Sequence, residues 1–282
     1  MSKPVYITAD STCDLSPALL ERFNIKVAPL HVLLGEESYL DGVDFAPDMI
    51  FERYKADKTL PRTAAVSPQE FADFFAPLVE AGYEVVHLDI SSELSATYQN
   101  AVIAAQELPG VYPIDTRNLT DGIALLLLEA CRLRDEGKSA AEIAQTVTDL
   151  RPKVQTSFVI DTLEYLWKGG RCTGVAAFGA NLLNLKPCIE MRDGKLEVGK
   201  KYRGNIFKVY EKYIADRLAG RAVRPDYVFV TSSSELPAEV AERLEALIRG
   251  TVEVKEVLFA RAGSTVSSHC GPGTMGILFL EA

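Results

Sequence analysis

The sequence of 282 residues predicts an α/β protein with two domains. In the first half, short apolar segments alternate with helical patterns, which is typical of βαβ crossovers and a parallel sheet. In the second half, an Asp-Gly pair between alternating segments indicates a β-hairpin, and the elements that follow predict an α+β domain with a mixed or antiparallel sheet. We place the domain boundary near Arg151 and Pro152, so the domains cover residues 1–152 and 153–282.

The first half contains local signals for the beginning of each element. Apolar segments predict strands at residues 5–8, 25–30, 84–90 and 111–115. Helices are predicted from Pro17, from Ser67 to about residue 80, from about residue 98 to 107, over residues 121–136, and from Ser139 onward. Ser67 and Ser139 each precede a glutamate by three positions, which forms a capping box, and proline suits a first helical turn. Residues 31–62 mix glycine, aspartate, proline and aromatics, so we expect a loop-rich segment with one helix near residues 47–55.

The second half is predicted from similar signals. Alternating residues on both sides of Arg192-Asp193-Gly194 give the hairpin. Extended segments are expected at residues 156–160, 188–191, 195–202, 227–231, 251–259 and 275–280. Helices are expected at residues 206–218 and 237–249, where they would cover one face of the sheet, and a shorter helical patch precedes Lys168.

Charge and hydropathy argue against several classes of protein. The net charge is −9, whereas a nucleic-acid-binding domain usually carries a basic excess, so we expect no nucleic-acid partner. Any anion site must then be built from local donors. The longest apolar run, residues 123–128, is far shorter than the ~20 residues that span a bilayer. Residues 1–10 lack the long apolar stretch of a signal peptide, and we therefore expect a cytoplasmic protein.

Cysteine and histidine usage predicts free thiols and no metal site. The five cysteines are odd in number and include no Cys-x-x-Cys pair, so disulfides and thiolate metal sites are not expected. The three histidines, His31, His87 and His269, show no metal-ligand spacing. His87 lies within an apolar strand and is expected in the core. His269 lies among hydroxyls and glycines, which favours a site residue.

Hydroxyl side chains gather where predicted strands end. Residues 91–98 follow a buried strand and enter a helix, which places Ser92, Ser95 and Thr97 at the carboxyl edge of the sheet. Backbone N–H groups at a helix start favour an anion, and ligands of open α/β sheets bind at this edge. Ser11 follows the first strand and could line the same edge. Plain capping of helices remains the alternative for these serines.

Three further segments contain candidate residues. Lys168-Gly169-Gly170-Arg171 could bring Arg171 to a carboxylate, or it could simply end a helix with cations near the negative end of its dipole. Thr63 lies in a predicted loop before the Ser67 helix, where a lone threonine is by itself a weak signal. Gly271, Gly273 and Gly276 match a G-x-G-x-x-G pattern, but no helix follows, so we reject a dinucleotide fingerprint. The sequence also contains no Walker A pattern.

Taken in order, six segments resemble the DegV family, and the resemblance covers nearly the whole chain. The segments are residues 8–15, 91–98, 165–171, 182–187, 201–204 and 269–274. The resemblance implies a two-domain α/β protein that binds a long-chain fatty acid between its domains. It also implies that the acyl chain is presented to a separate ATP-dependent fatty acid kinase, which converts the carboxylate to an acyl phosphate. The chain would then be a lipid-binding subunit, with no enzymatic activity, cofactor or nucleotide site of its own.

The family's carboxylate ligands match Thr63 and Ser95, and Arg171 and His269 match positions near the head group. Ser11, Ser92 and Thr97 are possible supporting residues. This chain departs from the family where Thr63 is followed by Ala64-Ala65-Val66 and where Ala96 replaces a glycine between Ser95 and Thr97. Both ligand hydroxyls are retained. A transient contact with a membrane surface stays open as a further property.

Two other functions are open at this point. A serine hydrolase could use Ser95 as nucleophile and His269 as base, although no G-x-S-x-G elbow surrounds Ser95. A binding protein for another apolar carboxylic acid would need the same polar head site and apolar cavity. Turnover of chromogenic esters distinguishes the first, and identification of the bound lipid distinguishes the second.

Overall fold

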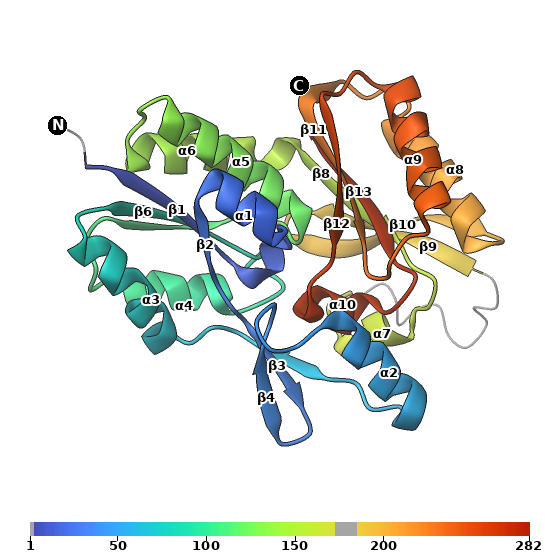
Figure 1. The fold of residues 1–282 in the computed structure, drawn as a ribbon, viewed down its shortest axis with the longest axis horizontal. Coiled ribbons are helices and arrows are strands. Elements are labelled where there is room, and N and C mark those ends of the chain that lie inside the picture. Colours follow the sequence, from blue (N-terminus) through green and yellow to red (C-terminus); the bar gives the residue numbers. More distant parts are fainter. Residues whose placement is uncertain (1–2, 173–184) are drawn as a thin grey trace.

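The computed structural model describes residues 3–172 and 185–282, which form two large sheets and one small sheet (Figure 1). The first large sheet is parallel throughout, with the strand order β2-β1-β6-β7. Its strands are β1 (Val5–Asp10), β2 (Ile25–Ala28), β6 (Glu84–Asp89) and β7 (Val111–Asp115). The helices α3 (Pro68–Glu80) and α4 (Thr97–Ala105) cover one face, and α5 (Asp121–Asp135) and α6 (Ala140–Leu150) cover the other. The predicted α/β fold with a parallel N-terminal sheet is confirmed.

The second large sheet is mixed, with the strand order β10-β9-β8-β13-β11-β12. Only β11 and β12 pair in parallel among the described strands of this sheet. Its strands are β8 (Val154–Val159), β9 (Leu185–Arg192), β10 (Lys195–Arg203), β11 (Val223–Ser232), β12 (Glu256–Arg261) and β13 (Met275–Glu281). The helices α8 (Ile206–Leu218) and α9 (Ala238–Thr251) lie on one face, as predicted.

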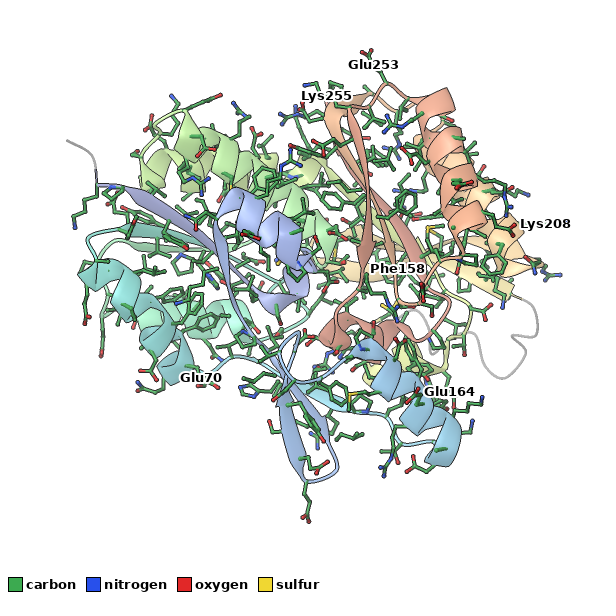
Figure 2. All side chains as sticks on the ribbon, viewed as in Figure 1. Glu70, Phe158, Glu164, Lys208, Glu253 and Lys255 are labelled. Carbon is green, nitrogen blue, oxygen red and sulfur yellow. The ribbon has the colours of Figure 1, made fainter. Side chains whose placement is uncertain are left out.

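Several helix starts have the predicted caps. Ser67 and Ser139 form complete capping boxes with Glu70 and Glu142, which satisfies donors that a helix start leaves unpaired. A third cap begins α1 (Pro17–Phe23), where Ser16 accepts a hydrogen bond from the N–H of Leu19. Figure 2 shows Glu70 at the outside of the molecule, whereas Phe158 of β8 lies in its interior.

The expected loop-rich segment contains a small antiparallel sheet that we did not predict. Its strands are β3 (His31–Leu34), β4 (Glu37–Leu40) and β5 (Arg62–Ala64), in the order β4-β3-β5. The expected helix in this segment is α2 (Pro47–Asp57). Each strand has only three or four residues, and β5 reaches its partner across the whole of α2, so periodicity could not identify them.

Two corrections concern the C-terminal region. The strand expected at residues 251–259 begins later, at Glu256, because α9 continues to Thr251. A short helix, α10 (Ser264–Cys270), was not predicted at all. It contains serine, threonine, valine and histidine, which favour helices weakly, and its neighbours in the chain give no capping side chain.

The largest hydrophobic core takes residues from both halves of the chain. Every residue of α5 from Asp121 to Cys131 is buried, because this helix lies between the two large sheets. This position explains the apolar run at residues 123–128. The domain boundary at residues 152 and 153 stays a prediction. No helix among the described residues is long and apolar enough to cross a membrane.

Candidate functional site

A cavity of about 210 Å³ brings together the four residues predicted for the head group. Thr63, Ser95, Arg171 and His269 all line it. Most of the remaining lining is apolar and comes from segments far apart in the sequence: Leu30, Ala64, Ala65, Ile90, Leu94, Ala96, Leu119, Leu166, Leu196, Val266 and Cys270. The cavity therefore combines apolar walls with a small set of polar groups, which is typical of sites for small apolar ligands.

Ser95 lies in the loop between β6 and α4, at the carboxyl edge of the parallel sheet. Its hydroxyl shares a hydrogen bond of 2.7 Å with the hydroxyl of Thr97, and it accepts another from the Thr97 N–H at 3.2 Å. Its own N–H donates to the carbonyl of Ser91 at 3.2 Å. Ser95 is not the cap of α4, because the N-cap position is Ala96 and no side chain caps this helix start. Its hydroxyl lies at the cavity and bonds only the first residue of the helix.

Thr63 lies on β5, and the prediction that it occupies a loop is wrong. It pairs with Val32 of β3, so its position is fixed by a sheet. Its Oγ1 lies 2.9 Å from Nε2 of His269, which belongs to α10. The structure therefore joins two of the predicted head-group residues across more than two hundred positions of sequence.

The imidazole of His269 is held in its neutral form. Burial, and then the positive charge of Arg171, lower its pKa from 6.5 to about 4. Its Nδ1 is buried and has no hydrogen-bond partner among the described residues. A side-chain carbon at Gly169 would collide with this Nδ1, so glycine at this position makes room for the ring. Within the Lys168-Gly169-Gly170-Arg171 segment, Gly169 thus makes room for His269 and Arg171 lines the cavity, whereas Lys168 pairs with Glu164.

Arg171 lies just beyond α7 (Glu164–Gly169) and is exposed at the edge of the cavity. Its Nη1 donates to the carbonyl of Gly169 at 2.8 Å, and its Nε donates to the carbonyl of Leu94 at 3.4 Å. These contacts connect the end of α7 to the loop that contains Ser95. Gly170 ends the helix in a left-handed conformation, so the helix-end alternative applies to this segment. A contact of Arg171 with a carboxylate stays a prediction.

Two aspartates from the first half of the chain accept hydrogen bonds from the start of α10. The sequence did not predict this contact. Asp14 accepts a hydrogen bond from the N–H of Gly263 at 2.9 Å, and Asp41 accepts one from the N–H of Ser264 at 2.8 Å. Burial raises the pKa of both carboxyls. A side-chain carbon on Gly263 would lie 2.8 Å from Oδ1 of Asp14, so this close approach requires glycine. These contacts fix the helix that contains Thr265, Val266, His269 and Cys270.

The three supporting residues have different surroundings. Ser11 donates to Asp41 at 3.0 Å and accepts from the N–H of Leu30, and Ser92 donates to Asp115 at 2.6 Å. Neither serine lines the cavity. Thr97 is buried beneath Ser95 and contacts the cavity only through that residue's hydroxyl. A contribution of Ser11, Ser92 and Thr97 to ligand binding stays a prediction.

The geometry does not form the pair that a serine hydrolase would require. Ser95 bonds Thr97 and His269 bonds Thr63, and no hydrogen bond joins Ser95 to His269 in the described ranges. No carboxylate orients Nδ1 of His269 in that part of the chain either.

The cysteines and the possible metal-ligating side chains can be located in the described part of the chain. All five cysteines are buried, and Cys13, Cys131, Cys188 and Cys270 are free thiols. The described residues contain no group of three or more His, Cys, Asp or Glu side chains placed to hold a metal ion. Gly271 lies between α10 and β13, where its missing side chain makes room for the ring of Tyr165.

Comparison with known proteins gives consistent matches over the full length. A family model described as "Uncharacterised protein, DegV family" matches residues 4–282. A DegV domain-containing protein of Clostridium acetobutylicum is 33% identical over 280 residues, covering 98% of both chains. A Thermus thermophilus structure described as "Fatty Acid Binding of a DegV family Protein" has a TM-score of 0.88 and 33% identity, with 100% of both chains covered. A stearic acid-binding protein of Eubacterium ventriosum has a TM-score of 0.84 and 28% identity over 98% of both chains. The chain belongs to the DegV family.

Proposed function

We propose that this protein binds a long-chain fatty acid, buries its tail, and presents its carboxylate to a separate ATP-dependent fatty acid kinase for conversion to acyl phosphate. The observation that carries the proposal is the cavity whose walls are apolar and whose polar residues include Thr63, Ser95, Arg171 and His269. The Thermus thermophilus and Eubacterium ventriosum relatives, which are described as fatty-acid and stearic-acid binders, support it.

The protonation of His269 suits a carboxylate ligand. A neutral imidazole carries one proton, and the Nδ1 position offers that proton no acceptor. A buried unpaired donor is costly, so we assign the proton to Nε2, which then donates to Oγ1 of Thr63. The hydroxyl proton of Thr63 is then free to donate to a carboxylate oxygen. Ser95 would supply the second hydroxyl, and the charge of Arg171 would offset that of the ligand.

The tail supplies the binding energy. Each methylene group removed from water contributes about 0.8 kcal/mol, so a long chain outweighs the cost of burying the head group. Leu119, Val266 and Cys270 line both this cavity and a second, smaller cavity of about 20 Å³ against the mixed sheet. We propose that the tail points toward these three residues and extends beyond them.

The head group must stay accessible for phosphoryl transfer, because a carboxylate oxygen would be the nucleophile. Hydroxyl donors orient these oxygens without the tight pairing that a buried arginine would impose. Ser95 is only partly buried and Arg171 is exposed, which leaves this end of the cavity open to a partner. We also place the protein in the cytoplasm, since free thiols are the usual state of cysteines there.

Mass spectrometry of lipid extracted from the purified protein tests the ligand. We expect one or more long-chain fatty acids in the native protein and a marked loss in Thr63→Ala and Ser95→Ala. Ser38→Ala is the matched control, because this exposed hydroxyl lies on β4 and contacts His31 outside the cavity. Unchanged lipid content in both site variants would contradict the head-group assignment. Recovery of a retinoid or an isoprenoid acid from the purified protein would show that this acid, and not a fatty acid, is the ligand.

Acyl-phosphate formation with ATP and a candidate kinase tests the partner. The variants Thr63→Ala and Ser95→Ala should reduce turnover even when fatty acid is supplied in excess, because the carboxylate is no longer oriented. Turnover equal to that of the native protein would contradict presentation. Hydrolysis of chromogenic esters that disappears in Ser95→Ala would favour a hydrolase instead.

A further inference from the structure

The tip of the β9–β10 hairpin docks on the loop that presents Ser95. The hydroxyl of Ser91 donates to the carbonyl of Gly194 at the tip, at 2.7 Å. The carbonyl of Ser91 in turn accepts the N–H of Ser95 at 3.2 Å. Ser91 is fully buried and does not line the cavity. Its side chain therefore holds the hairpin while its backbone holds the proposed ligand residue.

Arg117 makes a second connection to the same tip. Its guanidinium donates to the carbonyl of Asp193, and its Nη1 lies 3.5 Å from a carboxylate oxygen of Glu93 in the Ser95 loop. Lys195, which follows the tip, lies 3.4 Å from the other oxygen of Glu93. The docked tip thus places two cations around one acidic side chain of the loop.

The backbone at this contact departs from the conformations that most residues adopt. Arg117 has φ of 55° and Asp193 has φ of 47°, both in the left-handed region. A side-chain carbon on Gly194 would lie 2.6 Å from the Ser91 hydroxyl and 2.8 Å from Nε of Arg117. The close approach requires glycine at this position, where φ is 81°. Positive φ at Asp193 and Gly194 is what a two-residue hairpin turn requires. The left-handed backbone of Arg117, on the other side of the contact, belongs to no such turn.

The contact also brings together two walls of the cavity. Leu196 follows the tip on β10, Leu94 lies in the docked loop, and both line the cavity. The two leucines come from opposite halves of the chain. Moving the hairpin away from the loop would therefore separate two walls of the cavity and remove the hydrogen bond that fixes the Ser91 side chain, while the Ser91 N–H stays bonded to the carbonyl of Asn118.

We propose that the β9–β10 tip, held by Ser91 and Arg117, positions Ser95 and closes the cavity, so that the acyl chain enters and leaves when this docking breaks. The inference rests on the proposed fatty-acid binding. Ser91 and Arg117 are positioning residues, because they act through Ser95, Leu94 and Leu196 rather than on the ligand.

The kinetics of ligand exchange test the inference. The probe is cis-parinaric acid, a fluorescent long-chain fatty acid, followed by stopped flow in association and in displacement by oleate. In Arg117→Met, the tip loses a charge-assisted hydrogen bond that is partly exposed, so we expect both rates to rise about threefold to tenfold. The dissociation constant should change less, since the docking exists with and without ligand. Lys200→Met is the matched control, because it breaks the ion pair of β10 with Asp216 outside this contact.

A reversible crosslink gives the opposite test. The exposed side chains of Glu93 and Lys195 lie 3.4 Å apart across the contact, so Glu93→Cys with Lys195→Cys can be joined by a bismaleimide whose linker contains a disulfide, and the five native cysteines are buried. We expect exchange to slow at least about tenfold in the crosslinked protein and to recover when dithiothreitol cleaves the linker. Native rates in Arg117→Met would overturn the inference, as would a faster release without faster association. If the double variant does not fold, the Arg117→Met rates still decide. Failure of the native protein to bind the probe would instead refute the proposed function.

Discussion

At the residue scale, the residues at the polar end of the cavity depend on neighbouring glycines, because the absence of a side chain makes room for them. Gly169 leaves space for the imidazole of His269, and Gly263 lets two carboxylates reach the start of α10. Neutral His269 donates a hydrogen bond to Thr63, and the hydroxyl of Thr63 can donate in turn, so these two residues offer hydrogen-bond donors without a positive charge. The positive charge is left to Arg171, at the exposed edge. Under the proposed function, this division would let the site hold a carboxylate while leaving its oxygens reactive.

The lowered pKa of His269 predicts a specific loss of stability in acid. Because the folded pKa is about 4 and the unfolded value is 6.5, the unfolded chain takes up the proton first as the pH falls. The stabilising contribution is complete above pH 6.5 and is lost between 6.5 and about 4. At most, this loss amounts to about 3 kcal/mol. Chemical unfolding of the protein and of His269→Asn at several pH values measures it.

The difference between the two curves isolates this histidine from the other titrating groups. The free energy of unfolding should fall more steeply in the native protein than in His269→Asn across that window. The buried carboxyls with raised pKa, among them Asp14 and Asp41, titrate in both proteins and cancel. Parallel curves would show that the ring is not held neutral by its surroundings.

At the element scale, helices whose starts are stabilised by neighbouring residues could be predicted from the sequence, and elements stabilised by distant residues could not. Helices with capping boxes and apolar periodicity were predicted correctly, because Ser67 and Ser139 satisfy their own helix starts. The short helix α10 was missed because its start is satisfied by Asp14 and Asp41, more than two hundred residues away. Ser95 could be found from its place after a strand. Thr63 could be found only by resemblance, because its strand forms across an intervening helix.

The capping of α10 by distant side chains predicts that Asp14 matters to the ligand site. Asp14→Ala leaves the partly buried N–H of Gly263 without this acceptor, which should cost about 1–3 kcal/mol of stability. Because α10 contains His269, fatty-acid affinity should fall as well. Asp14→Asn retains an acceptor oxygen and should lose less of both. Thermal unfolding and titration with cis-parinaric acid measure the two effects.

Asp48→Ala is the control at this scale. Asp48 belongs to α2 and forms an ion pair with Arg261, and its side chain is 70% exposed. Such a pair contributes little, so stability and affinity should stay near the native values. If Asp14→Ala bound fatty acid as well as the native protein, α10 would be fixed by its packing alone.

At the scale of the whole molecule, the two halves of the chain share the core beneath the cavity. The largest core cluster includes Ile7 and Leu88 from the parallel sheet, and Phe158 and Leu278 from the mixed sheet. The helix α5 lies between them. We therefore propose that the boundary at residues 152 and 153 divides the chain into two topological units that stabilise each other.

This shared core predicts that the molecule unfolds in a single cooperative transition. Leu126 of α5 is fully buried between the two sheets, so Leu126→Ala should remove about 2–5 kcal/mol of stability. Leu244→Ala makes the same change in the separate cluster beneath α8 and α9. Both variants should melt in one transition by calorimetry and circular dichroism, at a lower temperature than the native protein. Two transitions in Leu126→Ala would mean that each sheet is stable alone, and that the cavity lies between independent domains.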